Sequence, residues 1–261
     1  MGLIVSIHSF RGGTGKSNLT ANLAVQAALA GKRVAVVDTD IQSPGIHVLF
    51  GITQHTMGKT LNDFLNERCP IDEVAQPVKN LMSGSYPTLS ENLQLWLIPS
   101  SINAREIGQV LRKGYDVARL NEGLQTLLQE LALDYLFIDT HPGLNEETLL
   151  SIAISDVLLV VLRPDQQDVQ GTAVTVDIAR SLDVPHLFLI VNKVLPRYDF
   201  GEVKRRMEDL FQAPVAEVLP LSEDVADNGS ATVFSLRFPE HSWSQKVRAL
   251  SAKLLSLEAG A

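Results

Sequence analysis

A glycine-rich stretch near the amino terminus, residues 10–18 (FRGGTGKSN), has the residue types that hold a phosphate group. Its glycines can turn backbone N–H groups inward at φ angles that other residues avoid. A helix that begins at such a turn adds the partial positive charge of its N-terminus, which favours anions. Lys16 can reach the terminal phosphates of a nucleotide, and the Ser17 hydroxyl can ligate Mg²⁺. The spacing therefore predicts a phosphate cradle, and the alternative is a glycine turn that binds no ligand.

Two predicted elements position this stretch. Leu3–His8 is an apolar run rich in β-branched residues, which predicts a buried strand. Residues 18–30 are rich in Ala and Leu, contain neither Pro nor Gly, and are followed by Gly31, which predicts a helix that ends there. The glycine stretch is therefore expected to connect a strand to a helix.

Two further apolar runs end in carboxylates. Val34–Asp38 is followed closely by Asp40, and residues 134–139 end in Asp139. Ligands of open α/β sheets bind at the carboxyl ends of the strands, so Asp38 and Asp40 are expected near the metal and the terminal phosphate. For Asp38 and Asp40, the alternative is that they only cap the turn that follows the strand.

The glycine stretch departs from the usual G-x-x-x-x-G-K-[ST] pattern, because Phe10 stands where that pattern has its first glycine. It fits the variant [KR]-G-G-x-G-K-[ST] and thereby resembles the deviant Walker A loop of the ParA/MinD family of ATPases. The resemblance covers nearly the whole chain and is weakest over residues 46–92. In that family a signature lysine at the position of Arg11 reaches the nucleotide of the partner subunit. Arg11 keeps the charge but is bulkier and planar.

The resemblance implies a set of site residues. Those implied for the nucleotide are Gly12, Gly13, Thr14, Gly15, Lys16, Ser17, Asn18, Asn192 and Pro220. Those implied for Mg²⁺ are Ser17, Asp38 and Asp139, and the catalytic residues are Arg11, Lys16 and Asp40. The cofactors are then ATP and Mg²⁺. ATP is favoured over GTP because Leu195 stands where GTPases carry the aspartate that recognises guanine.

Individual roles follow from the same resemblance. Asp40 is expected to position the attacking water, the N–H of Gly143 to sense the γ-phosphate, and Asn192 to hydrogen-bond adenine. The family more often has a small or apolar residue at the position of His141. We interpret His141 as a polar loop residue, and the alternative is that it tunes the segment around Gly143.

The alternation of strand and helix patterns predicts an α/β fold with a single doubly wound domain over residues 1–261 and a mostly parallel sheet covered by helices on both faces. Further strands are predicted at 93–99, 157–162, 186–191 and 215–220. Helices are predicted at 60–65, 71–74, 103–133 with a break near Gly114, 168–181, 202–211 and 242–257. Residues 80–92, rich in Ser, Gly and Pro, predict an irregular loop.

Composition narrows the class of protein. The net charge of −8 argues weakly against nucleic-acid binding, although a local basic patch can coexist with it. The single cysteine, Cys69, excludes an intrachain disulfide and the iron–sulfur branch of the family, and is expected to be half-buried. No apolar run approaches the ~18 residues that span a bilayer, and no signal peptide precedes the first strand. We therefore expect a cytoplasmic protein.

The resemblance implies a switch that forms a homodimer with ATP, hydrolyses MgATP slowly, and is stimulated by a partner protein while it positions DNA or a protein cargo. Non-specific DNA binding would use a patch of basic residues, for which a solvated helix face is the alternative. Its members are Lys204, Arg205, Arg206, Arg237, Lys246, Arg248 and Lys253. Three alternatives remain: an ATP-binding scaffold with little hydrolysis, a MinD-like membrane-associated protein, which the short C-terminal end disfavours, and a synthetase or amidoligase.

Overall fold

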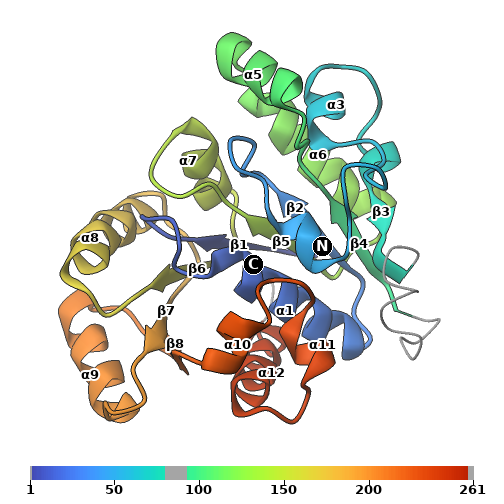
Figure 1. The fold of residues 1–261 in the computed structure, drawn as a ribbon. Helices are drawn as coiled ribbons and strands as arrows, with labels where there is room; N and C mark the ends of the chain where they lie inside the picture. Colours follow the sequence, from blue (N-terminus) through green and yellow to red (C-terminus); the bar gives the residue numbers. More distant parts are fainter. Residues whose placement is uncertain (1, 80–92, 258–261) are drawn as a thin grey trace.

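The structure, a computed structural model, describes residues 2–79 and 93–257. Its strands form one eight-stranded sheet in the order β3-β4-β2-β5-β1-β6-β7-β8, in which only β3 runs antiparallel to its neighbour (Figure 1). The strands are β1 (Leu3–His8), β2 (Val34–Asp38), β3 (Gln76–Pro77), β4 (Leu95–Ile98), β5 (Tyr135–Asp139), β6 (Val157–Leu162), β7 (His186–Val194) and β8 (Val215–Pro220). The predicted doubly wound α/β fold with a mostly parallel sheet is confirmed.

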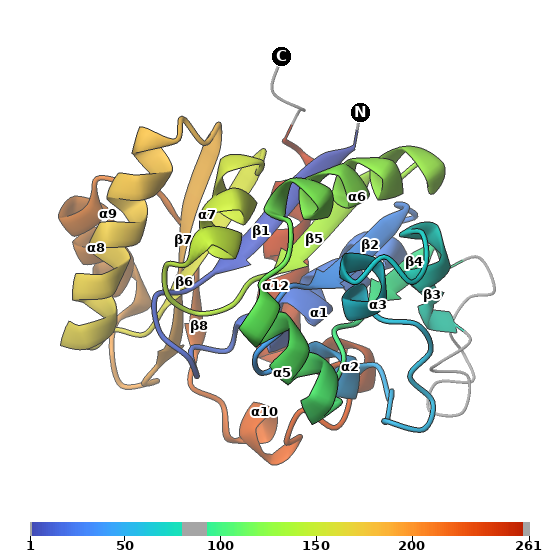
Figure 2. The same ribbon diagram turned by 90° about the horizontal axis from the view of Figure 1, so that it is seen from above.

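Helices cover both faces of the sheet. They are α1 (Lys16–Leu29), α2 (Ile46–Leu49), α3 (Leu61–Leu65), the 3₁₀ turn η1 (Asp72–Val74), α5 (Ala104–Lys113), α6 (Val117–Glu130), α7 (Glu146–Ala153), α8 (Gln166–Ser181), α9 (Phe200–Phe211), α10 (Glu223–Asp227), α11 (Phe234–Arg237) and α12 (Ser242–Leu255). In Figure 1, α1, α11 and α12 lie on one side of the sheet, and α6, α7 and α8 lie on the other. Figure 2 shows α5 and α10 beyond the carboxyl ends of the central strands.

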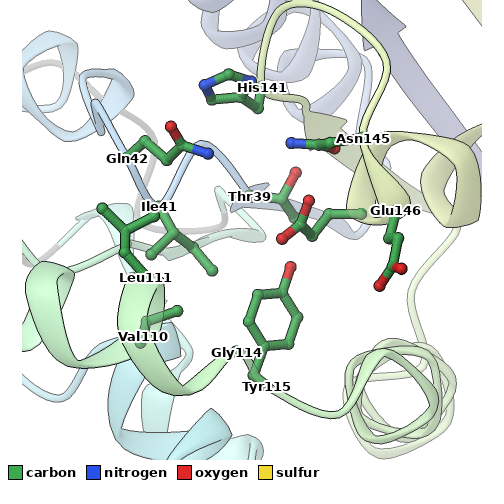
Figure 3. A pocket seen from close by; sticks show the side chains of 11 residues that line it. Thr39, Ile41, Gln42, Val110, Leu111, Gly114, Tyr115, His141, Asn145 and Glu146 are labelled. Carbon is green, nitrogen blue, oxygen red and sulfur yellow. The ribbon is translucent and has the colours of Figure 1, made fainter.

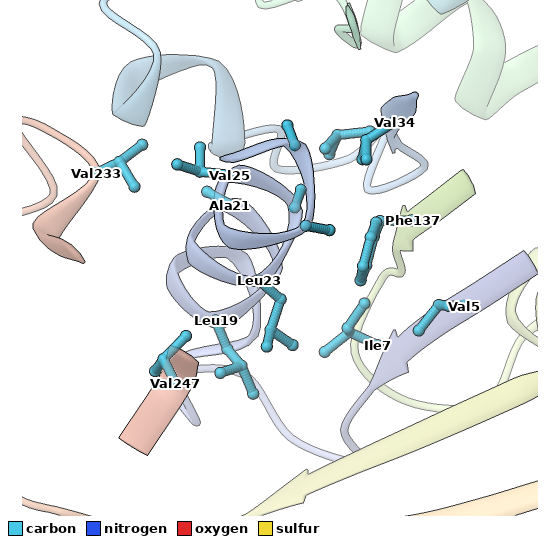
Figure 4. Close-up of a cluster of buried hydrophobic side chains, with 14 of the residues drawn as sticks. Val5, Ile7, Leu19, Ala21, Leu23, Val25, Val34, Phe137, Val233 and Val247 are labelled. Carbon is cyan, nitrogen blue, oxygen red and sulfur yellow. The ribbon is translucent and has the colours of Figure 1, made fainter. Parts of the chain in front are cut away.

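The alternation of side chains along the strands divides the core. Val5 and Ile7 of β1 point toward α1, whereas Ile4 joins the cluster under α5 and α6. In the first cluster, α1 lies between the sheet and α12, and its Leu19 and Leu23 are fully buried (Figure 4). Each such leucine contributes about 1.5–3 kcal/mol of burial free energy. The helix that follows the glycine stretch is therefore held firmly against the strand that precedes it.

Several boundaries differ from those predicted. The first helix begins at Lys16, two residues before the predicted start at Asn18, because the left-handed conformation of Gly15 ends the turn immediately before it. Strand β7 continues to Val194, so Asn192 lies inside it and not after it. Helix α7 was not predicted, although Asn145 caps it through a hydrogen bond from the Thr148 N–H.

Two further predictions concern which residues are buried. Cys69 is buried, with 8% of its surface exposed, and not half-buried as expected. The C-terminal apolar stripe packs into the core through Val247, Leu250 and Leu254, as predicted. The irregular loop predicted for residues 80–92 lies outside the described residues. Within residues 2–79 and 93–257, no helix is both long enough and apolar enough to cross a bilayer.

Phe10 has a structural role that explains its place in the glycine stretch. A Cβ atom added at Gly171, in the middle of α8, would lie 2.0 Å from Cδ1 of the Phe10 ring. The ring therefore packs directly against the backbone of α8. This contact fixes the first residue of the glycine stretch to the helix beside it.

We expect Gly171→Ala to lower the free energy of unfolding by about 1–3 kcal/mol, because the added methyl group forces Phe10 out of its place. Urea denaturation measures the change. The matched control is Gly108→Ala in α5, where the nearest atom would be the flexible Arg112 Nη1 at 3.5 Å. That variant is expected to gain up to about 1 kcal/mol from helix propensity. Equal stability of Gly171→Ala and the wild type would contradict the role of Phe10.

Candidate nucleotide-binding site

The glycine stretch forms a turn that suits an anion. Gly13 and Gly15 have φ angles of +79° and +96°, which side chains other than glycine rarely adopt. Gly15 is the N-cap of α1, no side chain hydrogen-bonds to that cap, and the first turn of α1 carries no acidic residue. The positive end of the helix dipole at this turn is therefore left for an external anion such as a phosphate.

The end of β7 braces this turn from the side. Asn192 donates a hydrogen bond from Nδ2 to the carbonyl oxygen of Thr14 at 2.8 Å, and Lys193 donates from Nζ to the carbonyl oxygen of Gly13 at 2.7 Å. A Cβ atom at Gly15 would lie 2.7 Å from Asn192 Nδ2, so only glycine fits there. Asn192, expected to contact adenine, here contacts the backbone of the cradle.

A cavity of about 240 Å³ lies beside the cradle. Four of the predicted nucleotide-binding residues line it: Gly15, Asn18, Asn192 and Pro220. Val225, Ser230 and Trp243 also line it and were not predicted, because no motif marks them. Asn18 donates to the Ser230 hydroxyl at 2.9 Å, which ties α1 to the segment after α10. The position and the apolar wall of this cavity suit a planar base attached to phosphates in the cradle.

The two carboxylates among the predicted metal ligands are neighbours in the sheet. Asp38 of β2 and Asp139 of β5 are register partners, and both are buried. Asp38 accepts hydrogen bonds from the N–H of Asp40 at 3.0 Å and from the N–H of Gly45 at 3.3 Å. Asp139 accepts from the Thr20 hydroxyl at 3.3 Å. The strand order therefore brings together two carboxylates that lie far apart in the sequence.

Burial and the charges of neighbouring carboxylates raise the pKa of both carboxyls. Burial, then the charges of Asp139 and Asp40, raise the pKa of Asp38 well above its usual value. Burial also raises the pKa of Asp139 to about 6, and the nearby Lys16 charge and Ser17 hydroxyl limit the rise. Such a pair favours a bound cation, because a cation offsets the repulsion between ionised carboxylates.

The residues present fit Mg²⁺. This ion is commonly held by one or two carboxylates together with the phosphates of a substrate. Asp38, Asp139 and the Ser17 hydroxyl supply the protein oxygens of that set. No group of three or more His, Cys, Asp and Glu side chains that could hold a metal alone occurs in the described part of the chain. The site thus suits a metal that arrives with a phosphate ligand.

Removal of Mg²⁺ with EDTA makes the effect of this pair on stability measurable. Because the pKa of Asp139 is raised on folding, the folded protein binds more protons than the unfolded one between about pH 4 and 6, and stability falls as pH rises through that window. We expect Asp139→Asn to be more stable than the wild type at pH 7 by about 1–3 kcal/mol, and this difference to vanish near pH 4. Urea titrations at both pH values measure it; a difference independent of pH would contradict the argument.

Asp40, the predicted catalytic carboxylate, lies where two segments meet. Its Oδ1 accepts hydrogen bonds from the N–H of Ser43 at 3.0 Å and from the Ser43 hydroxyl at 3.1 Å. His141 Nε2 lies 3.8 Å from the same Oδ1 atom. His141 thus faces the carboxylate expected to position water, which is the kind of contact that a tuning role would use.

The N–H of Gly143 has an internal partner. It donates to the carbonyl oxygen of Ser9 at 3.2 Å, and Gly143 has a φ angle of +86°. In this conformation the N–H does not point at a γ-phosphate. The predicted sensing role therefore requires the residue 140–144 segment to change partners.

The side chain of Arg11 contacts α8 and not the turn of the cradle. Its side chain is exposed and donates from Nη1 to Oε1 of Gln167 in the first turn of α8. It is thus held on the surface of its own subunit. The predicted role in a partner subunit needs an exposed side chain of this kind.

His8, which the sequence analysis did not select, is buried directly before the cradle. Its Nδ1 lies 2.8 Å from the Thr140 hydroxyl, which itself donates to the carbonyl oxygen of Ile7 at 2.9 Å. Burial, with a contribution from the Lys16 charge, lowers the pKa of His8 to about 3, so the ring is neutral. His8 therefore connects the end of β1 to the segment after β5 as a neutral brace. Its only signal in the sequence is a polar residue at the end of an apolar strand.

Most of the proposed basic patch has partners within the chain. Lys246 Nζ contacts Glu217 Oε1 at 2.8 Å, and Lys204 Nζ lies 3.8 Å from Glu208 Oε1. Arg248 and Lys253 donate to backbone carbonyls at 3.0 and 2.8 Å. These contacts favour the reading of a solvated, locally paired surface over that of a patch built for phosphates.

Comparisons with known proteins agree with this geometry. A family model described as an AAA domain matches residues 2–183. An uncharacterised ATP-binding protein of Methanocaldococcus jannaschii is 27% identical over 256 residues, covering 98% of this chain and 88% of that protein. The septum site-determining protein MinD of Synechocystis is 26% identical over 225 residues, covering 84% and 76%. The cell division ATPase MinD of Pyrococcus furiosus has the same fold, with a TM-score of 0.81 at 20% identity over 99% of this chain and 100% of that one.

The variant glycine stretch, the paired aspartates at the ends of adjacent strands and the sequence relatives lead to one conclusion. The chain belongs to the ParA/MinD family of P-loop ATPases.

Proposed function

We propose that the protein is an ATP-dependent switch that dimerises with MgATP bound and hydrolyses it slowly until a partner protein stimulates turnover. The observation that carries the proposal is the buried pair Asp38 and Asp139 beside Lys16, at the uncapped N-terminus of α1. This arrangement places positive and negative groups as a metal–triphosphate complex requires. In this proposal residues 1–261 act as one domain in the cytoplasm.

Each group has a stated task in the proposed reaction. Backbone N–H groups of residues 13–17 and the Lys16 ammonium hold the β- and γ-phosphates and offset the charge that develops on the γ-phosphoryl group. Asp38, Asp139 and Ser17 would hold Mg²⁺, which supplies further neutralisation of that charge. Asp40 orients a water in line with the bond to the leaving ADP. Asn192 and Pro220 face the base.

Dimer formation is proposed to involve Arg11. Arg11 and Gln167 are both exposed on the surface. The Arg11 guanidinium can therefore leave Gln167 and contact a phosphate held by a second copy. A planar guanidinium can bind two phosphate oxygens at once. The nucleotide then lies between the two subunits, and its hydrolysis separates them.

The proposal is tested by size-exclusion chromatography of Asp40→Ala with MgATP. Without the carboxylate that orients water, this variant is expected to keep ATP and remain dimeric, whereas the wild type returns to monomer as ATP is consumed. Lys16→Ala in the same background is the control, and it should stay monomeric. A monomeric Asp40→Ala protein at every concentration, with ATP bound, would contradict the dimer switch.

DNA is the first binding partner to test. A gel-shift assay on the ATP-locked dimer at several salt concentrations reports non-specific binding, because affinity for phosphates falls steeply as salt rises. Retention of DNA only with ATP supports a partition function. ATP-bound dimers that do not bind DNA would favour a protein cargo instead.

A second candidate is an ATP-binding scaffold with little hydrolysis. It is supported by the internal partners of Arg11 and of the Gly143 N–H, since both groups must change contacts before they can act on a phosphate. Single-turnover measurement of phosphate release separates the two candidates. A dimer that forms with ATP and releases no phosphate, with or without a cargo, favours the scaffold.

A further inference from the structure

A second cavity, of about 320 Å³, lies behind Asp40 and apart from the nucleotide cradle. Thr39, Ile41 and Gln42 form one side, and the end of α5 with the turn before α6 closes the cavity (Figure 3). The remaining side is formed by His141, Asn145, Glu146 and Glu147. The two segments that meet at Asp40 and His141 therefore also form the walls of this cavity. Its volume is at the lower end of the range for small-molecule sites.

One part of the cavity is apolar. Ile41 and Val110 are buried within the protein core, and Leu111 has 55% of its surface exposed, although it is a large hydrophobic residue. Figure 3 shows the three side chains together on one side of the cavity. An exposed leucine beside two buried aliphatic residues provides a surface for a short alkyl chain.

The other part is polar and electronegative. Glu146 and Glu147 contribute carboxylates from the first turn of α7, and no lysine or arginine lines the cavity. The hydroxyl of Tyr115 points into it (Figure 3), and Glu147 is its hydrogen-bonding neighbour. Nδ1 of His141 is buried and has no hydrogen-bond partner in the described part of the chain. Buried polar atoms are normally hydrogen-bonded, so this nitrogen indicates a missing partner.

The surroundings of Tyr115 keep its hydroxyl protonated. Burial, and then the charge of Glu147, raise the pKa of the phenol well above its usual value. The hydroxyl is therefore neutral at physiological pH. Its oxygen can accept a hydrogen bond while the nearby carboxylates accept others.

We propose that this cavity binds a small aliphatic cation, a guanidinium or primary ammonium group on a short alkyl stem. The stem packs against Ile41, Val110 and Leu111, and the cationic head donates hydrogen bonds to Glu147 and to the Tyr115 oxygen. Two carboxylates without a basic residue exclude an anion. Glu146 adds to the negative potential at the cavity.

Binding here affects the catalytic site. The ligand contacts segments on either side of Asp40, and a ligand that binds one arrangement of these segments more tightly shifts the population toward it. This consequence rests on the proposed ATPase function. The binding site itself does not, because it is assembled from residues outside the cradle.

The test uses the full chain, labelled with ¹⁵N, without nucleotide. Butylguanidinium is titrated, and its neutral isostere butylurea is the matched probe. We expect saturable shifts of the backbone amides of residues 39–42, 141 and 143–147, with a Kd of about 1 mM for a ligand of this size, and none with butylurea. Equal binding of both probes, or shifts elsewhere only, would overturn the proposal.

Two variants test the named contacts. Glu147→Gln keeps the shape and removes the charge, and Tyr115→Phe keeps the ring and removes the oxygen. We expect Glu147→Gln to weaken binding about tenfold and Tyr115→Phe about threefold. Glu130→Gln, at the exposed end of α6, is the control with the same change of net charge and should bind as the wild type does. Wild-type affinity in Glu147→Gln, with an unchanged melting temperature, would refute the site.

Phosphate release with MgATP, with and without saturating butylguanidinium, then tests the link to catalysis. A change of about twofold or more in the wild type, lost in Glu147→Gln, supports that link. Binding without any change in turnover would reject the link and leave the site standing. A protein that binds butylguanidinium and hydrolyses no ATP would contradict the proposed ATPase function and leave the proposed binding site standing.

Discussion

Replacing Lys16 with alanine is expected to weaken the binding of MgATP by at least about a hundredfold. Lys16 is the first residue of α1 and only 7% of its surface is exposed, so its ammonium is well placed for phosphates held at that turn. Hydrogen bonds to a charged group contribute about 1.5–3 kcal/mol each, and two such bonds account for the expected loss. Equilibrium dialysis with labelled ATP measures the affinity.

The control for Lys16→Ala is Lys113→Ala, which removes the same charge from the exposed end of α5. It is expected to bind MgATP as the wild type does. Loss of Lys16 also removes a charge that lowers the pKa of Asp139, so folding must be checked by circular dichroism at the same pH. A folded Lys16→Ala protein with wild-type affinity would show that the triphosphate does not bind in the predicted cradle.

Replacing Arg11 with alanine is expected to weaken ATP-dependent dimerisation at least about tenfold and to leave ATP binding to the monomer largely unchanged. The reason is the position of Arg11, which is exposed and turned away from its own cradle toward Gln167. Light scattering across a concentration series, with MgATP and the Asp40→Ala background to prevent hydrolysis, measures the dimer constant.

Gln167→Ala provides the matched comparison. It removes the internal partner of Arg11 without changing the charge, so the guanidinium no longer exchanges one contact for another on dimerisation. We expect dimers of equal or greater stability in this variant. If Arg11→Ala dimerises as the wild type does, Arg11 has no role across the interface. The presence of Arg11 in place of the family's signature lysine then has no effect on dimerisation.

The sequence predicted the parts of this site that depend on neighbouring residues. The cradle over residues 10–18 and the acids at the ends of β2 and β5 could be recognised because glycine conformations, helix starts and strand patterns are local properties. Helix α7 was not predicted because it is short, although the capping pair Asn145 and Thr148 is a local signal for its start.

Only the tertiary structure placed distant segments against one another. The pairing of Asp38 with Asp139, the approach of His141 to Asp40 and the packing of Phe10 on Gly171 each join residues from different elements. The cavity behind Asp40 arises in the same way, from the turn after α5 and the start of α7. A local pattern determines what a segment can form, whereas contacts between segments depend on the strand order and on how the helices pack, which no short stretch of sequence contains.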